Sequence, residues 1–105
     1  MDLAANCYRE TKSFPRHEIY GMTSQIRRSA ASIPANVAEG YGRESTGSYV
    51  QFLRVAQGSL KELETHLMLC ERVELMTLSQ ASELLETCER VSKMLRNLIR
   101  ALPAS

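Results

Sequence analysis

Four basic residues near the carboxyl end of the chain have a spacing that would let them bind phosphates together. They are Arg90, Lys93, Arg96 and Arg100, and no acidic residue lies between them. At about 100° per residue of an α-helix, their side chains fall within an arc of roughly 120° on one face. Cations grouped in this way bind the phosphates of RNA or DNA without reading the bases. Such cations also complement a helix dipole on a solvated surface, and both interpretations remain open.

Three further arginines add to these cations. Arg27 and Arg28 are adjacent, and Arg43 follows Gly42 in a predicted loop. Tyr41 is the aromatic residue beside that loop, so we expect base stacking, and with it base-specific recognition, to be weak. The leading hypothesis is therefore binding of RNA or DNA through phosphates. The alternative is a structural or protein-interaction module whose cations are only solvated surface.

Charge is unevenly distributed along the chain, although the formal net charge is only +1. Residues 1–43 contain six basic and four acidic residues, and residues 44–89 contain three basic and eight acidic residues. Residues 90–105 contain four basic residues and no acidic one. A chain of this kind can present one basic surface while it remains nearly neutral as a whole.

Patterns for catalysis and metal binding are weak. Glu62, His66 and Cys70 share one helical face, but the apolar periodicity assigns Cys70 to the core, so we do not expect a metal there. The sequence has no nucleophile motif, no phosphate-binding glycine loop and no nuclease-like carboxylate cluster. The cysteines, which include Cys7 and Cys88, are odd in number and widely spaced, which argues against disulfides and zinc. We predict that the protein is not an enzyme and holds no metal or cofactor.

Apolar periodicity predicts an all-α fold, with residues 1–105 forming a single four-helix-bundle domain. Three long segments alternate apolar spacings of four and three, with Thr23 as a polar exception. These segments are Ile19 to Val37, Tyr49 to Cys70 and Ala81 to Leu102. They predict helices of about 26 residues each. A further helix is predicted over Asp2 to Lys12.

Turn and capping residues separate the predicted helices. Pro15 is expected to open the second helix, and Gly40 and Gly42 are expected to end it. Ser45 or Thr46 would cap the third helix, and Thr77 or Ser79 would cap the fourth. Because all the connections are short, we expect an antiparallel, up-down-up-down arrangement.

Two helix-breaking residues lie inside the predicted helices. Pro34 is expected to kink the second helix, because the apolar period continues across it. Asn36 and Glu39 would then bond freed backbone groups or a neighbouring subunit; the alternative is that they line a groove. Gly58 lies in the third helix, where glycine is about 1 kcal/mol less favourable than alanine. We expect another helix to approach it closely, within the subunit or across an interface.

The segment from Ser32 to Arg43, with Pro34, Gly40 and Gly42 inside it, resembles the signature of a bacterial family. This is the family of four helix bundle proteins, also called 23S rRNA intervening sequence proteins. The resemblance extends to Phe14, Pro15, Glu18, Tyr20, Gly21, Thr23 to Arg28, Phe52, Leu53, Ala56, Gly58 to Leu60 and Glu62 to Thr65.

The resemblance implies a four-helix bundle that forms a homo-oligomer, namely a pentamer. A related branch, the accessory variability protein of diversity-generating retroelements, binds nucleic acid and a reverse transcriptase, so both are candidate partners. Family members usually have a longer first helix. We therefore expect a shortened first helix here, with apolar surface left uncovered near one end of the bundle.

No apolar run approaches the roughly 20 residues that a membrane-spanning helix needs. The chain begins with Met1 and Asp2, without a basic segment followed by an apolar one. We expect a cytoplasmic protein without a membrane partner.

Overall fold

The computed structural model describes residues 1–103, which form four α-helices and one short 3-10 helix. The elements are α1 (Asp2–Thr11), η1 (Arg16–Glu18), α2 (Met22–Tyr41), α3 (Thr46–Arg72) and α4 (Leu78–Ala101). The part of the chain that the structure describes contains no strand, so the all-α prediction is confirmed.

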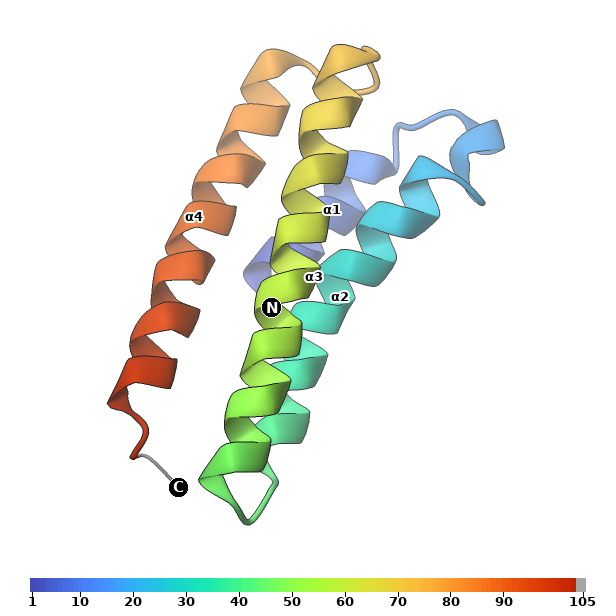
Figure 1. Cartoon of the computed structure of the whole chain (residues 1–105). Coiled ribbons are helices and arrows are strands. Elements are labelled where there is room, and N and C mark those ends of the chain that lie inside the picture. The colour runs from blue at the N-terminus through green and yellow to red at the C-terminus, as the bar shows by residue number, and fades with distance from the viewer. Residues whose placement is uncertain (104–105) are drawn as a thin grey trace.

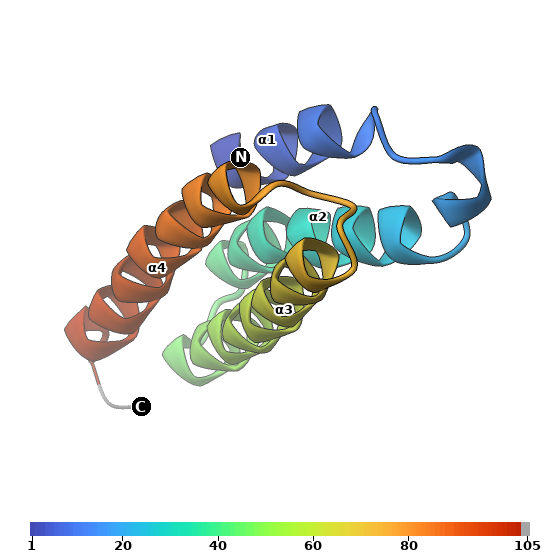
Figure 2. The same ribbon diagram turned by 90° about the horizontal axis from the view of Figure 1, so that it is seen from above.

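The helices pack around one apolar core. Figures 1 and 2 show how the helices are arranged. α3 lies between α2 and α4, and the short α1 packs against α2 and α4. The inward-facing leucines of α3, such as Leu53, Leu60 and Leu67, are almost completely buried. These are the positions that the alternating spacing of four and three assigned to the core. Cys7, Cys70 and Cys88 are also buried and free.

Capping residues define where α3 and α4 begin. Ser45 precedes α3, and its hydroxyl accepts a hydrogen bond from the Ser48 backbone N–H at 3.1 Å. Thr77 precedes α4 and forms a capping box with Gln80, in which each side chain accepts from the other residue's backbone N–H. Of the candidate caps in the sequence, Ser45 and Thr77 are thus the ones used.

The expected start of the second helix is wrong. Pro15 adopts an extended conformation and leads into the 3-10 turn η1, so α2 begins only at Met22. The Glu18 carboxylate accepts a hydrogen bond from the Met22 backbone N–H at 3.2 Å, which satisfies a free donor at the new helix start. Ile19 therefore lies outside α2, and its side chain is exposed rather than part of the core.

α2 continues through Pro34 and ends at Tyr41, with Gly42 as its C-cap. Gly40, which was expected to help end the helix, instead lies buried inside it. A Cβ at this position would lie 2.7 Å from Phe52 Cβ and 2.9 Å from Tyr49 Cδ1. Its role is close packing of α2 on α3, because any side chain here would collide with α3.

Gly58 does not have the role within this chain that its position in α3 indicated. It is exposed, and no atom lies within 4 Å of the place where its Cβ would be. Close approach of another helix of the same subunit is therefore wrong as an explanation. Close approach across a subunit interface stays a prediction.

Candidate nucleic-acid interface

The four cations of the basic stripe, Arg90, Lys93, Arg96 and Arg100, are exposed on α4. Arg90 donates a hydrogen bond to Thr87 Oγ1 at 3.0 Å, and Lys93 lies 4.0 Å from Glu89. Among residues 1–103, Arg96 and Arg100 have no side-chain hydrogen bond or ion pair. The last turns of α4 thus present two guanidinium groups whose charge no neighbouring acid compensates.

A groove between α1 and α4 limits the stripe on its amino-terminal side. Its lining includes Glu10, Glu83 and Glu86 together with Arg90. Carboxylates repel phosphate, so this groove disfavours a nucleic-acid backbone next to Arg90. The electrostatically favourable part of α4 is therefore its carboxyl-terminal half.

Arg27 is used to hold α1 on α2. Its Nε donates to Thr11 Oγ1 at 2.9 Å, its Nη2 lies 3.4 Å from the Tyr8 carbonyl oxygen, and its guanidinium lies 4.7 Å from the Tyr8 ring centroid. These contacts satisfy groups at the carboxyl-terminal end of α1, where a cation is also favourable. The sequence contained no signal for this role, because the partners lie 16 and 19 residues away.

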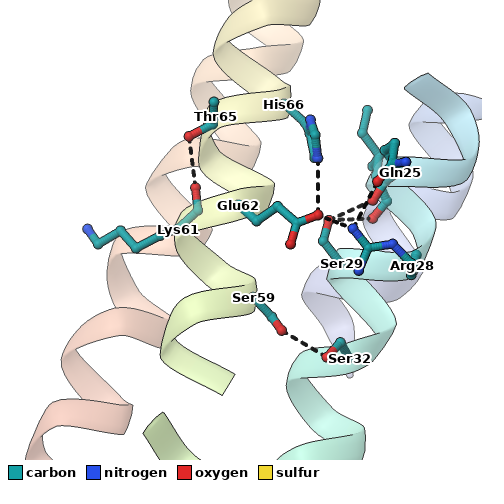
Figure 3. Close-up of polar contacts among 10 residues, drawn as sticks. Gln25, Arg28, Ser29, Ser32, Ser59, Lys61, Glu62, Thr65 and His66 are labelled. Carbon is teal, nitrogen blue, oxygen red and sulfur yellow. Dashed lines mark hydrogen bonds and ion pairs between the residues drawn. The ribbon is translucent and has the colours of Figure 1, made fainter. Parts of the chain in front are cut away.

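Arg28 belongs to a polar cluster that joins α2 to α3 (Figure 3). It pairs with Glu62 and donates to Gln25 Oε1 at 2.8 Å, and His66 Nε2 lies 3.4 Å from Glu62 Oε1. Desolvation opposes ionisation of Glu62, but the hydrogen bonds from Arg28 and His66 outweigh it and hold the Glu62 pKa below its ordinary value. The charge of Arg28 is therefore largely compensated within the protein.

Arg43 lies at the turn between α2 and α3. It pairs with Glu39 at 2.5 Å, and its guanidinium lies 4.8 Å from the Phe52 ring centroid. Tyr41 is 78% exposed beside it. Figure 1 shows that this turn and the carboxyl-terminal end of α4 lie at the same end of the molecule. Arg43 therefore lies at the same end of the molecule as the last turns of α4, with its charge partly compensated by Glu39.

The residues around Pro34 form a hydrogen-bonded chain between α2 and α3. Asn36 Nδ2 donates to the Ser32 carbonyl at 2.8 Å and to Ser32 Oγ at 2.9 Å. Ser32 Oγ in turn lies 2.8 Å from Ser59 Oγ, as Figure 3 shows. Asn36 thus bonds the Ser32 carbonyl and not the Ala30 carbonyl, which is the group that Pro34 leaves free, and the Glu39 carboxylate pairs with Arg43. Contact of either residue with a neighbouring subunit stays a prediction.

The three cysteines are buried thiols. Burial raises the pKa of Cys7 and Cys88 to about 12 and that of Cys70 to about 11, so all three are neutral thiols near pH 7. Among residues 1–103, no three His, Cys, Asp or Glu side chains are placed to hold a metal ion.

None of the helices among residues 1–103 is long and apolar enough to cross a bilayer.

Comparison with known proteins identifies the family of this chain and solved structures similar to it. A family model described as 23S rRNA-intervening sequence protein matches residues 1–97. One similar crystal structure is that of a protein with unknown function from Bacteroides thetaiotaomicron, which is assigned to the S23 ribosomal protein family. It superposes on this chain with a TM-score of 0.81. It is 26% identical in sequence, and the match covers 93% of this chain and 89% of that one. No curated protein matches.

Proposed function

Because the chain belongs to the 23S rRNA-intervening sequence protein family, we propose that it binds RNA or DNA through phosphate contacts, as an oligomeric protein without enzymatic activity. The observation that supports this most directly is the pair of exposed guanidinium groups, Arg96 and Arg100, that no acid of the described chain neutralises. A phosphate can approach them without breaking an existing bond. The family name is itself taken from an RNA, which favours a nucleic acid as the partner.

The phosphate-binding surface centres on the carboxyl-terminal half of α4. Lys93 adds to it readily, because an exposed pair at 4.0 Å contributes little and is easily exchanged. Arg43 lies at the same end of the molecule. Arg27 and Arg28 would have to give up contacts that hold helices together, so we assign them a structural role in place of the binding role expected from sequence.

Oligomerisation is the second element of the proposal. Several large apolar side chains of α3 and α4 are about half exposed or more, namely Val55, Met68, Leu69 and Met94. Such surface favours association of copies, and the family resemblance points to a homopentamer. A ring of copies would also multiply the phosphate-binding groups, because each copy contributes its own α4. We place this assembly in the bacterial cytoplasm.

A salt titration tests the proposal. Fluorescence anisotropy with labelled RNA and duplex DNA, from about 50 to about 200 mM salt, should show affinity falling steeply, because phosphate binding releases counterions. The double variant Arg96→Gln and Arg100→Gln should lower the slope of log affinity against log salt by about 1.8 for duplex DNA and about 1.4 for a single strand.

The matched control removes two cations from α3. Arg54 and Lys61 lie on α3, outside the proposed surface on α4; Arg54 bonds Gln57 at 3.1 Å and Lys61 lies 3.7 Å from Glu64. Arg54→Gln with Lys61→Gln should leave the slope nearly unchanged. If the control pair proved as damaging as the α4 pair, the binding surface would lie elsewhere. Absence of binding at about 50 mM salt would contradict the proposal.

The second candidate function is a protein-interaction module, such as an accessory protein of a reverse transcriptase. The observation in its favour is an exposed apolar group at the opposite end of the bundle, around the turn between α3 and α4. Leu69, Val73 and Leu78 are 45%, 55% and 68% exposed there. Under this alternative, changing these residues would abolish partner binding, whereas changing the α4 cations would not.

A further inference from the structure

The turn between α2 and α3 carries an aromatic cluster that the function proposed above does not use. Tyr41 is the last residue of α2, and its ring packs edge-to-face on Tyr49, with ring centroids 6.1 Å apart and planes at 81°. Phe52 follows Tyr49 by three residues on α3, and the Arg43 guanidinium lies over the Phe52 ring at 4.8 Å from its centroid. Tyr41 remains 78% exposed, so much of its ring surface is open to solvent.

Close packing holds this cluster in place. Because Gly40 has no side chain, the backbone of α2 approaches to within contact distance of Tyr49 and Phe52. Gly42 then ends the helix, and its backbone N–H donates to the Ala38 carbonyl oxygen at 3.3 Å. The backbone that carries Tyr41 is therefore held by close packing, so a ligand that stacks on the ring does not have to order this turn.

The same turn also carries a positive charge, that of Arg43, close to the aromatic cluster. Glu39 holds the Arg43 guanidinium through one nitrogen, Nη2, and guanidinium has five N–H donors, so others stay free. Figure 1 places the carboxyl-terminal end of α4, which carries Arg96 and Arg100, at this end of the molecule. An exposed aromatic ring beside cations is the combination with which proteins bind single-stranded nucleic acid.

We propose that Tyr41 is a base-stacking site that directs this protein to single-stranded nucleic acid, with Arg43 and the α4 cations contacting the neighbouring phosphates. This inference rests on the function proposed above and adds that the preferred ligand is single-stranded rather than duplex nucleic acid. Bases inside a duplex have both faces covered by their neighbours, so only an unpaired base can stack on Tyr41. The ordered position of Tyr41 strengthens the stacking that the sequence alone led us to expect as weak.

The test compares three labelled ligands of about 12 nucleotides, a length within the usual site size. They are a single strand, the duplex of the same sequence, and an abasic strand that keeps the phosphates but lacks the bases. Tyr41→Ala in the full chain should weaken single-strand binding about 5- to 150-fold and leave the duplex and the abasic strand within about twofold. Tyr41→Trp should retain or improve single-strand binding.

Tyr20 provides the control, because it is 95% exposed in the turn before α2 and no aromatic ring partner for it is found among residues 1–103. Tyr20→Ala should change none of the three affinities. The inference would be overturned if Tyr20→Ala lowered the affinity for the single strand as much as Tyr41→Ala does. It would also be overturned if Tyr41→Ala lowered the affinity for the abasic strand as much as it lowers that for the normal strand. Circular dichroism and gel filtration verify that the variants fold.

A second measurement uses the unmodified protein. A single strand carrying 2-aminopurine at successive positions should show quenched fluorescence at one or two positions when bound, because the probe stacks on an aromatic ring. Binding without quenching at any position would overturn the stacking site and leave phosphate binding intact. Absence of binding for all ligands at about 50 mM salt would overturn both proposals.

Discussion

The α2–α3 contact and the outward surfaces of α3 and α4 use the same residue types in opposite ways. At the contact, Gly40 makes room for Phe52 and Tyr49, and Arg28 pairs with Glu62. On the outward surfaces Gly58 faces open space, and Arg100 has no ion-pair partner within the described chain. A glycine or arginine inside a helix therefore indicates packing only where a neighbouring helix is present. Where no helix of the chain lies opposite, the same residues are available to another molecule.

The largest expected effect is at the contact itself. Gly40→Val places side-chain atoms where Phe52 Cβ already lies, so we expect the free energy of unfolding to fall by about 3 kcal/mol. Urea denaturation measures this loss. Gly42→Ala is the control, because its Cβ would meet its nearest neighbour at an ordinary 3.6 Å. A Gly40→Val variant as stable as its parent would show that α2 and α3 are not packed in this way.

The next effect tests whether the arginines of α2 are structural. Arg27→Gln removes the contacts to Thr11 and Tyr8, and we expect a loss of about 2 kcal/mol in stability. The salt slope of nucleic-acid binding should stay unchanged. Arg9→Gln, an exposed cation on α1, should alter stability by less than about 0.5 kcal/mol. A lower salt slope without loss of stability would return Arg27 to the binding surface.

Gly58→Ala tests the outward surface of α3. Because nothing in the chain lies near the added methyl group, helix propensity should stabilise the dissociated subunit by about 1 kcal/mol. If a second copy packs on Gly58, the same variant should assemble less well. Light scattering over a dilution series, combined with denaturation at the lowest concentration, separates the two effects. Unchanged assembly would show that no other subunit approaches Gly58.

The smallest effect is the pH dependence of the polar cluster at the contact. The pKa of Glu62 is lowered in the folded state, so its contribution is present above the ordinary value of 4.5 and is lost as the pH falls below it. The group is exposed, so the contribution should be under about 0.5 kcal/mol. Denaturation should show Glu62→Gln less stable than the parent at pH about 7, with the difference vanishing near pH about 3. A difference that persists at low pH would mean that the Glu62 charge does not contribute; Glu86→Gln is the control.

Local rules predicted much of the fold from the sequence. The burial of Leu53, Leu60 and Leu67 follows from a helical period that a single segment contains. The caps Ser45 and Thr77 bond to backbone only three residues away, so the sequence limited each cap to two neighbouring candidates, and the structure shows which of the two is used. The exposed cations of α4 follow from the same period, since they lie opposite its buried face.

The structure alone decided which residues meet across helices. The start of α2 was missed because proline permits a helix start at Pro15 but does not require one, and the Glu18 side chain satisfies the donor at Met22. The different roles of Gly40 and Gly58 depend on where α2 ends along α3. The ion pair between Arg28 and Glu62 spans 34 residues. Sequence periodicity determines which face of a helix is buried, but the partner of each side chain on that face depends on how the helices are placed in three dimensions.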